Sequence, residues 1–292
     1  IVCKQWNSAW FHADGYSSLK QLGNYRYKMI RGIDFYQHCY EKIQASPQVT
    51  VVHDKVVEIT QNSVGTRIFT EGGQYEGEYV FNSILLENPL MQKNAHHLLQ
   101  HFKGWVIETA QDIFDVDACT LMDFRVSQLH GTTFVYVMPL TKRKALVEYT
   151  LFTEQLLRDD QYVAGLKHYI NEYLQGVDYT VLEEEFGIIP MTSARFKQVD
   201  GNISFIGTAG GQTKASSGFT FMFIQKQSAL IVEQLKKTGK PFYQRSKNLK
   251  RFSWFDKVLL NVLIKKRVPG DLVFKKMFQK NPIERIFKFL DN

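Results

Sequence analysis

The chain has 292 residues and has few or none of several sequence features that would identify its structural class directly. It has only three cysteines, which lie far apart without a C-x-x-C pair, so a disulfide scaffold is not expected and a reducing compartment is favoured. It has seven prolines and is 44% hydrophobic, which excludes a largely disordered protein. No apolar run approaches the roughly 18 residues of a membrane span, and no secretory signal is visible. These absences leave a protein with a sizeable core.

Short motifs of several enzyme classes are also missing. The sequence contains no P-loop, no G-x-S-x-G elbow and no G-x-G-x-x-G fingerprint. His96, His97 and His101 lie close together, but they form no H-E-x-x-H pattern and have no carboxylate at ligand spacing. We therefore expect no bound metal.

The net charge of +7 is unevenly distributed. Residues 236–292 hold 16 lysines and arginines against 4 acidic residues, a net charge of +12, whereas residues 1–235 carry −5. Because the body is mildly acidic, a nucleic-acid groove is disfavoured, and no nucleic-acid partner is expected.

Periodicity indicates alternating α and β segments. A capping box at Asp34 and Gln37 predicts a helix to Ile43, and alternating runs over 49–82 predict a small antiparallel meander. Residues 134–140 and 145–152 flank a polar turn and predict a hairpin. Further helices are predicted over 159–174, over 219–237 and in the tail from residue 240.

A glycine-rich loop follows the short apolar strand at 203–206. Its glycines are Gly207, Gly210, Gly211 and Gly218, and Lys214 lies among them without a nearby carboxylate. Such a loop before a helix suits the binding of phosphate or of a flavin's electron-rich edge. A tight strand-to-helix connection that needs glycine for packing explains the pattern equally well.

Acidic residues occur in three strand-like segments. Glu148 lies in an apolar run, and apolar surroundings bias a carboxyl group toward the protonated form that a general acid needs. Alternatively, Glu148 lies at a sheet edge or forms an ion pair with Arg143. Asp123 and Arg125 share one strand face, which is typical of a mutual ion pair. Glu185 is the last residue of the acidic run 183–185, a pattern that is also typical of a solvent-exposed strand end.

Six ordered blocks resemble the bacterial-type lycopene cyclases, flavoproteins of carotenoid biosynthesis. The blocks are residues 101–109 (HFKGW, with ET at 108–109), 120–125 (TLMDFR), 134–140 (FVYVMPL), 145–150 (ALVEYT), 184–192 (EEFGIIPMT) and 206–221 (IGTAGGQTKASSGFTF). They cover most of residues 100–221, whereas the first hundred residues and the tail fit more loosely.

The resemblance implies an α/β (α+β) fold with a Rossmann-like FAD/NAD(P)-binding domain. An antiparallel substrate domain would be inserted in it, and a helical tail would follow. The family begins with a βαβ unit that carries the dinucleotide fingerprint, so we expect that this first unit is missing here. The expected division is 1–95 for the remainder of the FAD domain with the meander, 96–198 for the substrate sheet, 199–238 for the glycine loop and its helix, and 239–292 for the tail.

The resemblance also implies a reaction. A ψ end of lycopene, or of a related acyclic carotenoid, would close to a β-ionone ring without net redox change. The family needs reduced FAD, with NAD(P)H as the reductant. The residue regarded as the general acid in the family corresponds to Glu148, while Asp123 and Glu185 are weaker candidates for catalytic residues. Gly207, Ala209, Gly210, Gly211, Lys214 and Gly218 would meet the cofactor.

Two other functions remain open at this stage. One is an FAD-dependent hydroxylase or reductase of the same fold that acts on an isoprenoid or aromatic substrate. The other is a non-catalytic carotenoid-binding protein. The basic, amphipathic tail favours a peripheral position on the cytoplasmic membrane, where a lipid-dissolved substrate would be available, although a helical cap on the core would share its pattern.

Overall fold

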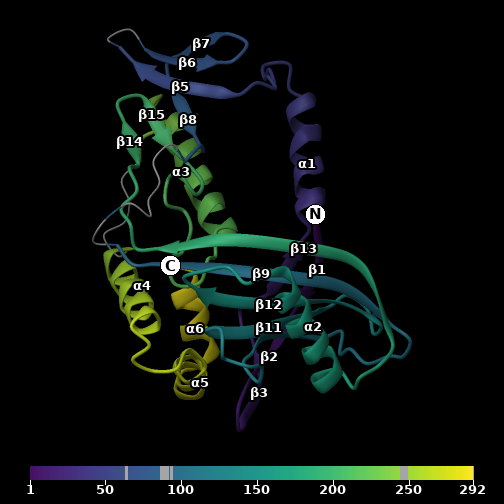
Figure 1. Cartoon of the computed structure of the whole chain (residues 1–292). Helices are drawn as coiled ribbons and strands as arrows, with labels where there is room; N and C mark the ends of the chain where they lie inside the picture. The colour runs from purple at the N-terminus through teal and green to yellow at the C-terminus, as the bar shows by residue number, and fades with distance from the viewer. Residues whose placement is uncertain (63–64, 86–91, 93–94, 244–248, 292) are drawn as a thin grey trace.

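A computed structural model describes the chain except for residues 63–64, 86–91, 93–94, 244–248 and 292. Its lower part is a broad sheet with helices on both faces, and its upper part contains two small sheets and two long helices (Figure 1). The helices of the described residues are α1 (Gly32–Gln44), α2 (Asp159–Tyr173), α3 (Phe221–Thr238), α4 (Leu249–Ile264), α5 (Gly270–Lys280) and α6 (Ile283–Leu290).

The broad sheet has seven strands in the order β13-β9-β12-β11-β10-β2-β3. Their bounds are β2 (Ser8–Ala13), β3 (Tyr16–Gln21), β9 (His97–Thr109), β10 (Ala118–Asp123), β11 (Thr132–Pro139), β12 (Lys144–Thr153) and β13 (Tyr179–Thr192). All neighbours are antiparallel except β10 and β2, which run parallel. The β11–β12 pair confirms the predicted hairpin.

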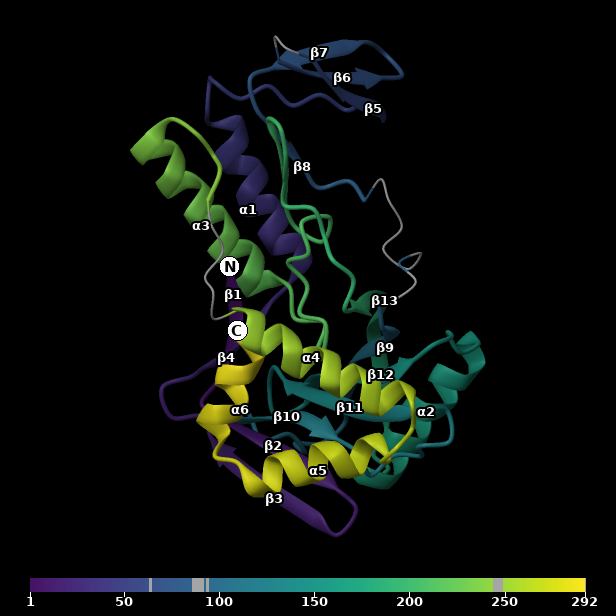
Figure 2. The ribbon, with the colours of Figure 1, turned by 90° about the vertical axis from the view of Figure 1, so that its left-hand side faces the viewer.

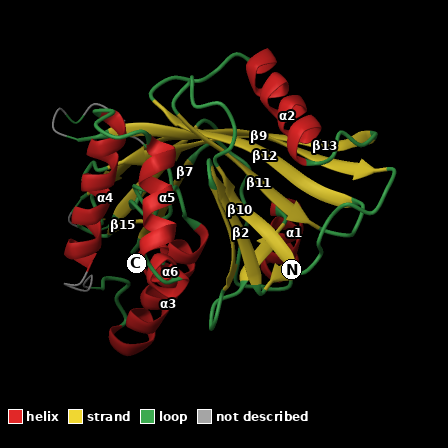
Figure 3. Cartoon of the chain, turned by 90° about the horizontal axis from the view of Figure 1, so that it is seen from below, coloured by secondary structure: helices red, strands yellow, loops and turns green. Residues whose placement is uncertain are grey.

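Alternating side chains give the sheet two buried faces, because successive residues of a strand point to opposite sides. Val147, Tyr149 and Leu151 of β12 pack in a cluster with α2. The other face contributes Phe134 and Tyr136 to a larger cluster with α4, α5 and α6. Figure 3 shows α2 and the three tail helices on opposite sides of the sheet. The tail is therefore part of the core.

The upper part joins segments that are far apart in sequence. Its strands are β5 (Val56–Gln61), β6 (Thr66–Thr70), β7 (Gln74–Gly77), β8 (Val80–Asn82), β14 (Val199–Asp200) and β15 (Ile203–Phe205). β5, β6 and β7 form the predicted antiparallel meander, but β8 pairs in parallel with β15, directly before the glycine loop. Phe35 of α1 makes an edge-to-face contact with Phe221 of α3, and these helices lie side by side (Figure 2).

The N-terminal segment departs from the expected division. β1 (Val2–Trp6) pairs with β4 (Tyr27–Ile30), whereas β2 and β3 belong to the broad sheet. Residues 1–95 thus contribute strands to both parts, because β2 pairs in parallel with β10 in the broad sheet. Phe11 of β2 stacks on Phe278 of α5 with ring centroids 4.0 Å apart, which also ties the tail to this sheet.

Candidate active site

Glu148 lies in a row of residues that face one another across four neighbouring strands. Register places Glu148 of β12 opposite Tyr136 of β11 on one side and Gly104 of β9 on the other. Gly104 in turn lies opposite Glu185 of β13. Glu148 thus lies inside the sheet, not at its edge. Arg143 donates its guanidinium hydrogen bonds to the Thr109 and Ala110 carbonyl oxygens, so it is not the partner of Glu148.

A cavity of about 290 Å³ opens beside Glu148. This volume is near the lower end of the range of roughly 300–1,000 Å³ for small-molecule pockets. The lining is mostly apolar and aromatic. It comprises Tyr27, Lys28, Met29 and Ile30 of β4, Gln100 and Phe102 of β9, Tyr136 and Met138 of β11, Leu146 and Glu148 of β12, Ile189 of β13, and Phe219. The cavity therefore joins the sheet to the end of the glycine loop.

The surroundings of Glu148 favour its protonated form. Burial raises the pKa of Glu148 to about 8, a hydrogen bond from Thr150 opposes the rise, and Glu185 adds to it. The Thr150 hydroxyl donates to Oε1 of Glu148 across 2.7 Å. Because the neutral acid predominates at pH 7, the side chain can donate a proton into the cavity.

Gln100 is a site residue that the sequence analysis did not identify. Its Oε1 atom is buried without a hydrogen-bond partner among the described residues. A Cβ atom on Gly218 would approach this oxygen to 2.4 Å, and φ of Gly218 is +69°. Gly218 is therefore needed where the loop passes close to β9. A buried acceptor that lines the cavity suits a ligand with a donor group.

The glycine loop is tightly wound. Gly207 and Gly211 have φ of +58° and +66°, a region that favours glycine, and Ala209 is buried. A Cβ atom on Gly210 would collide with the Phe205 backbone, so this position also excludes a side chain. The loop follows β15 and precedes α3, as predicted from the sequence.

Lys214 is held toward the tail helices. Its ammonium group lies 2.9 Å from Oδ1 of Asp256 in α4 and 4.3 Å from the centroid of the Phe289 ring. The Ser216 hydroxyl donates to the same Asp256 oxygen across 2.6 Å. Burial lowers the pKa of Lys214, and Asp256 opposes this change. The side chain thus anchors the loop to α4. Sequence periodicity could not reveal the distant partner.

A second cavity of about 530 Å³ lies between the loop, α3 and α4. Gly211, Gln212 and Thr213 line it beside the cationic side chains of Arg195 and Lys226. Gln198 also lines it and has a buried Oε1 atom with no partner among the described residues. The loop backbone and Arg195 suit an anionic group, whereas Gln198 Oε1 suits a hydrogen-bond donor and Lys226 is paired with Asp291 at 2.8 Å.

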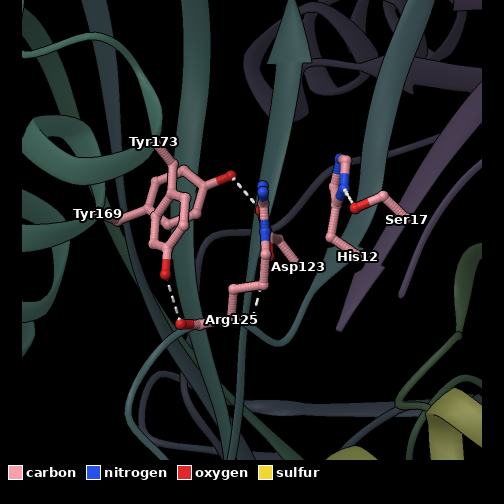
Figure 4. A network of polar contacts seen from close by, with 6 residues as sticks. All are labelled: His12, Ser17, Asp123, Arg125, Tyr169 and Tyr173. Atoms are coloured by element: carbon pink, nitrogen blue, oxygen red, sulfur yellow. Dashed lines mark hydrogen bonds and ion pairs between the residues drawn. The ribbon is translucent and has the colours of Figure 1, made fainter. Parts of the chain in front are cut away.

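Asp123 belongs to a different network, shown in Figure 4. Arg125 bonds both Asp123 oxygens, at 2.9 Å and 2.5 Å, and the Tyr169 hydroxyl of α2 donates to Oδ2 across 2.9 Å. The Tyr173 hydroxyl donates to the Arg125 carbonyl oxygen across 2.8 Å. Because α2 covers the face opposite Glu148, the structure separates Asp123 from the cavity and makes it part of the sheet-to-helix contact.

The three neighbouring histidines also have different surroundings. His101 is fully buried, contacts the hydroxyls of Tyr162 and Thr153, and has its pKa lowered by burial to about 4. His97 contacts the Thr192 hydroxyl across 2.7 Å. Within the described part of the chain, no group of three or more His, Cys, Asp or Glu side chains is placed to hold a metal ion.

The sequence model described as "Lycopene cyclase protein" matches residues 1–292, the whole chain. The chain belongs to the lycopene cyclase family. No curated protein matches the sequence significantly. The family assignment confirms the resemblance inferred from the six blocks.

Solved structures similar to this lycopene cyclase family member share its fold at low sequence identity. A geranylgeranyl bacteriochlorophyll reductase-like protein of Thermoplasma acidophilum has a TM-score of 0.63 and 9% identity, over 91% of this chain and 74% of that one. HpxO of Klebsiella pneumoniae, complexed with FAD and uric acid, has a TM-score of 0.61 and 12% identity, over 99% of this chain and 80% of that one. A flavoprotein/dehydrogenase from Cytophaga hutchinsonii has a TM-score of 0.58 and 12% identity, over 86% of this chain and 66% of that one. These likenesses confirm the α/β, Rossmann-like fold class.

The tail of this family member is largely buried. Phe274, Phe278 and Leu290 are at most 8% exposed in the core below the sheet. On α4, in contrast, Trp254 is 60% and Val258 42% exposed. No helix of the described residues is long and apolar enough to cross a membrane. The apolar residues of the tail therefore serve mainly as core, and α4 keeps an exposed apolar face.

Proposed function

We propose that the protein is a lycopene cyclase that closes ψ ends of an acyclic carotenoid to β-ionone rings by acid-initiated cyclisation. The observation that carries this proposal is Glu148, a carboxyl group kept protonated inside a cavity with apolar and aromatic walls. Membership of the lycopene cyclase family supports the substrate class. An isomerase of this kind needs an acid stronger than water and a site that excludes water.

Glu148 would act as the general acid. Its O–H bond breaks as a C–H bond forms at the terminal double bond of the substrate, which leaves a cation on the adjacent carbon. An internal double bond supplies the electron pair for the ring-closing C–C bond. Loss of a proton from the ring carbon then restores a neutral alkene. The substrate and product are isomers, so the atoms and electrons balance without an oxidant or reductant.

The cavity walls would protect the cation. Phe102, Tyr136 and Phe219 present aromatic rings to the space beside Glu148. An aromatic ring attracts positive charge through its quadrupole, with an energy of about 0.5–2 kcal/mol per contact. Met29 and Leu146 add apolar side chains to this lining.

The glycine loop would hold FAD. Gly211, Gln212 and Thr213 line the cavity at this loop, and Arg195 offers positive charge beside them. When bound in its reduced form, kept so by NAD(P)H, the flavin would supply an electron-rich surface that stabilises positive charge. Lys214 would act indirectly, by fixing the loop on α4.

We propose that the exposed face of α4 rests on an anionic membrane surface. Trp254 and Val258 project from this helix, and Arg251, Lys257 and Lys265 surround them with positive charge. A helix with exposed apolar residues among basic ones binds at the interface of anionic lipid. This position would bring the protein to the lipid in which a carotenoid is dissolved.

Expression of the complete reading frame in a lycopene-accumulating bacterial strain tests the reaction. The wild-type protein should convert lycopene to ring-bearing carotenoid, measured by pigment chromatography. Glu148→Gln keeps the shape but cannot donate the proton, so ring formation should fall at least about 100-fold, as for loss of a general acid.

Glu184→Gln is the matched control, because Glu184 lies next to Glu185 on the same strand but pairs with Lys103 at 3.3 Å. This variant should retain near-wild-type ring formation. Near-normal product from Glu148→Gln would remove Glu148 from the mechanism. Stoichiometric consumption of NAD(P)H with product would instead identify a hydroxylase or reductase, and unchanged lycopene would leave a binding protein.

A further inference from the structure

Gly104 leaves a gap between two acidic side chains. It lies on β9 directly between Glu148 of β12 and Glu185 of β13. A Cβ atom at this position would approach Cγ and Oε1 of Glu185 to 2.8 Å, and Cδ1 of Leu146 to 3.1 Å. The Glu185 side chain therefore lies across the backbone of Gly104 and reaches toward β12. Any residue with a Cβ atom would displace it.

The two carboxyl groups act on each other, since Glu185 raises the pKa of Glu148 whereas Glu148 opposes the rise in the pKa of Glu185. Glu185 is the more exposed of the two and lies on the edge strand, whereas Glu148 is partly buried against the cavity. A negative charge is less costly on the group that water can reach. The charge therefore resides on Glu185, and the shared proton resides on Glu148.

Other ionisable groups lie near this pair, and among the described residues none of them, Lys28 included, forms an ion pair with either carboxyl group. They are Tyr27 and Lys28 of β4, Cys119 of β10, Tyr136 of β11 and Glu183 of β13. Burial raises the pKa of both tyrosines and raises that of Cys119 to about 12, so these groups stay neutral. Glu183 adds negative charge beside Glu185 and thereby reinforces the retention of a proton.

We propose that Glu185 is a positioning residue that keeps the proton on Glu148, and that Gly104 provides the gap in which the two carboxyl groups meet. This inference rests on the proposed function of Glu148 as the acid. The pair holds one proton at rest. When Glu148 protonates the substrate, both carboxylates are ionised beside the cation, and the proton released from the ring carbon restores the original state.

The exposure of Glu185 gives the pair a second use. Glu185 contacts both Glu148 and the solvent, so a proton lost from the buried acid can be replaced through the edge strand without opening the cavity. Glu185 thereby links a water-excluding site to bulk water. An aliphatic residue at position 185 would break this link and would also remove the charge that favours protonation of Glu148.

The proposal is tested by titrating the infrared band of the protonated carboxyl group, assigned by its loss in Glu148→Gln. Glu185→Gln removes the neighbouring charge and should lower the pKa of Glu148 by about one unit or more. Gly104→Ala displaces the Glu185 side chain and should shift the pKa in the same direction. Since the acid must be protonated, ring formation should be lost at correspondingly lower pH in both variants.

Glu184→Gln, on the same strand, should leave the titration of Glu148 unchanged. An unshifted band in Glu185→Gln would overturn the proposal, even if Gly104→Ala failed to fold. The titration needs no turnover, so it is independent of the reaction. A wild-type protein that makes no ring but shows the shift would refute the proposed function and retain the carboxyl pair.

Discussion

Asp123 and Glu148 have opposite surroundings on the two faces of one sheet. Asp123 is fully buried but receives three hydrogen bonds from Arg125, one of them from the backbone N–H, and one from Tyr169, so its charge is compensated. Glu148 has a threonine hydroxyl and a second carboxyl group, and no cation bonds it. The first arrangement fixes the position of α2 on the sheet. The second keeps a proton available.

The Asp123 network predicts a difference between two similar tyrosines. Tyr169→Phe removes a donor to a buried carboxylate and should cost about 1.5–3 kcal/mol of unfolding free energy, as for hydrogen bonds to charged groups. Tyr173→Phe removes a donor to a backbone carbonyl oxygen and should cost about 0.5–1.5 kcal/mol. Urea unfolding measures both values. Equal losses would show that the Asp123 charge is not stabilised by Tyr169.

Sequence alternation placed Glu148 among apolar neighbours, and the family resemblance made it the expected acid, but neither revealed its contact with Glu185. The apolar neighbours of Glu148 are on its own strand, within reach of a local pattern. The contact with Glu185 depends on the registers of β9 with both β12 and β13, and the second register contains an irregularity between Val181 and Glu183. No local pattern encodes such a shift. Gly104 was visible only as part of a family block.

At the scale of elements, the tail helices have both a buried and an exposed part. Periodicity predicted an amphipathic tail, and α6 shows why the pattern was ambiguous. Four of its five apolar residues, Ile283, Ile286, Phe287 and Leu290, are buried, and Phe289 is partly buried. A core-packing stripe and a membrane-binding stripe have the same spacing, so only tertiary contacts distinguish them. The structure assigns α5 and α6 to the core and leaves the outer face of α4 exposed.

The exposed face of α4 predicts lipid binding that depends on Trp254. Trp254→Ser should weaken binding to vesicles with anionic lipid by about tenfold or more, since burial of a large apolar side chain contributes about 1.5–3 kcal/mol. Val57→Ser, on β5, is the control because Val57 is also 60% exposed. Vesicle flotation provides the measurement. Equal binding by both variants would exclude α4 as the contact.

For the whole molecule, local patterns predicted separate elements, and the resemblance to the lycopene cyclases supplied the fold class. The hairpin, the meander and the strand–loop–helix around Gly207 were each predicted from local patterns and are present. The parallel pairing of β2 with β10 was not predicted, because it joins segments about a hundred residues apart. Local sequence thus indicated the elements, and long-range register determined which of them line the cavity.

The central claim is that Glu148 begins an isomerisation by transferring a solvent-exchangeable proton to carbon. The most direct test is the mass of the carotenoid product formed in D₂O. Each ring closure should add one deuterium to carbon and release one hydrogen, with the elemental composition otherwise unchanged from the substrate. A ring-bearing product without deuterium, or a product that has gained oxygen or two hydrogens, would contradict this account.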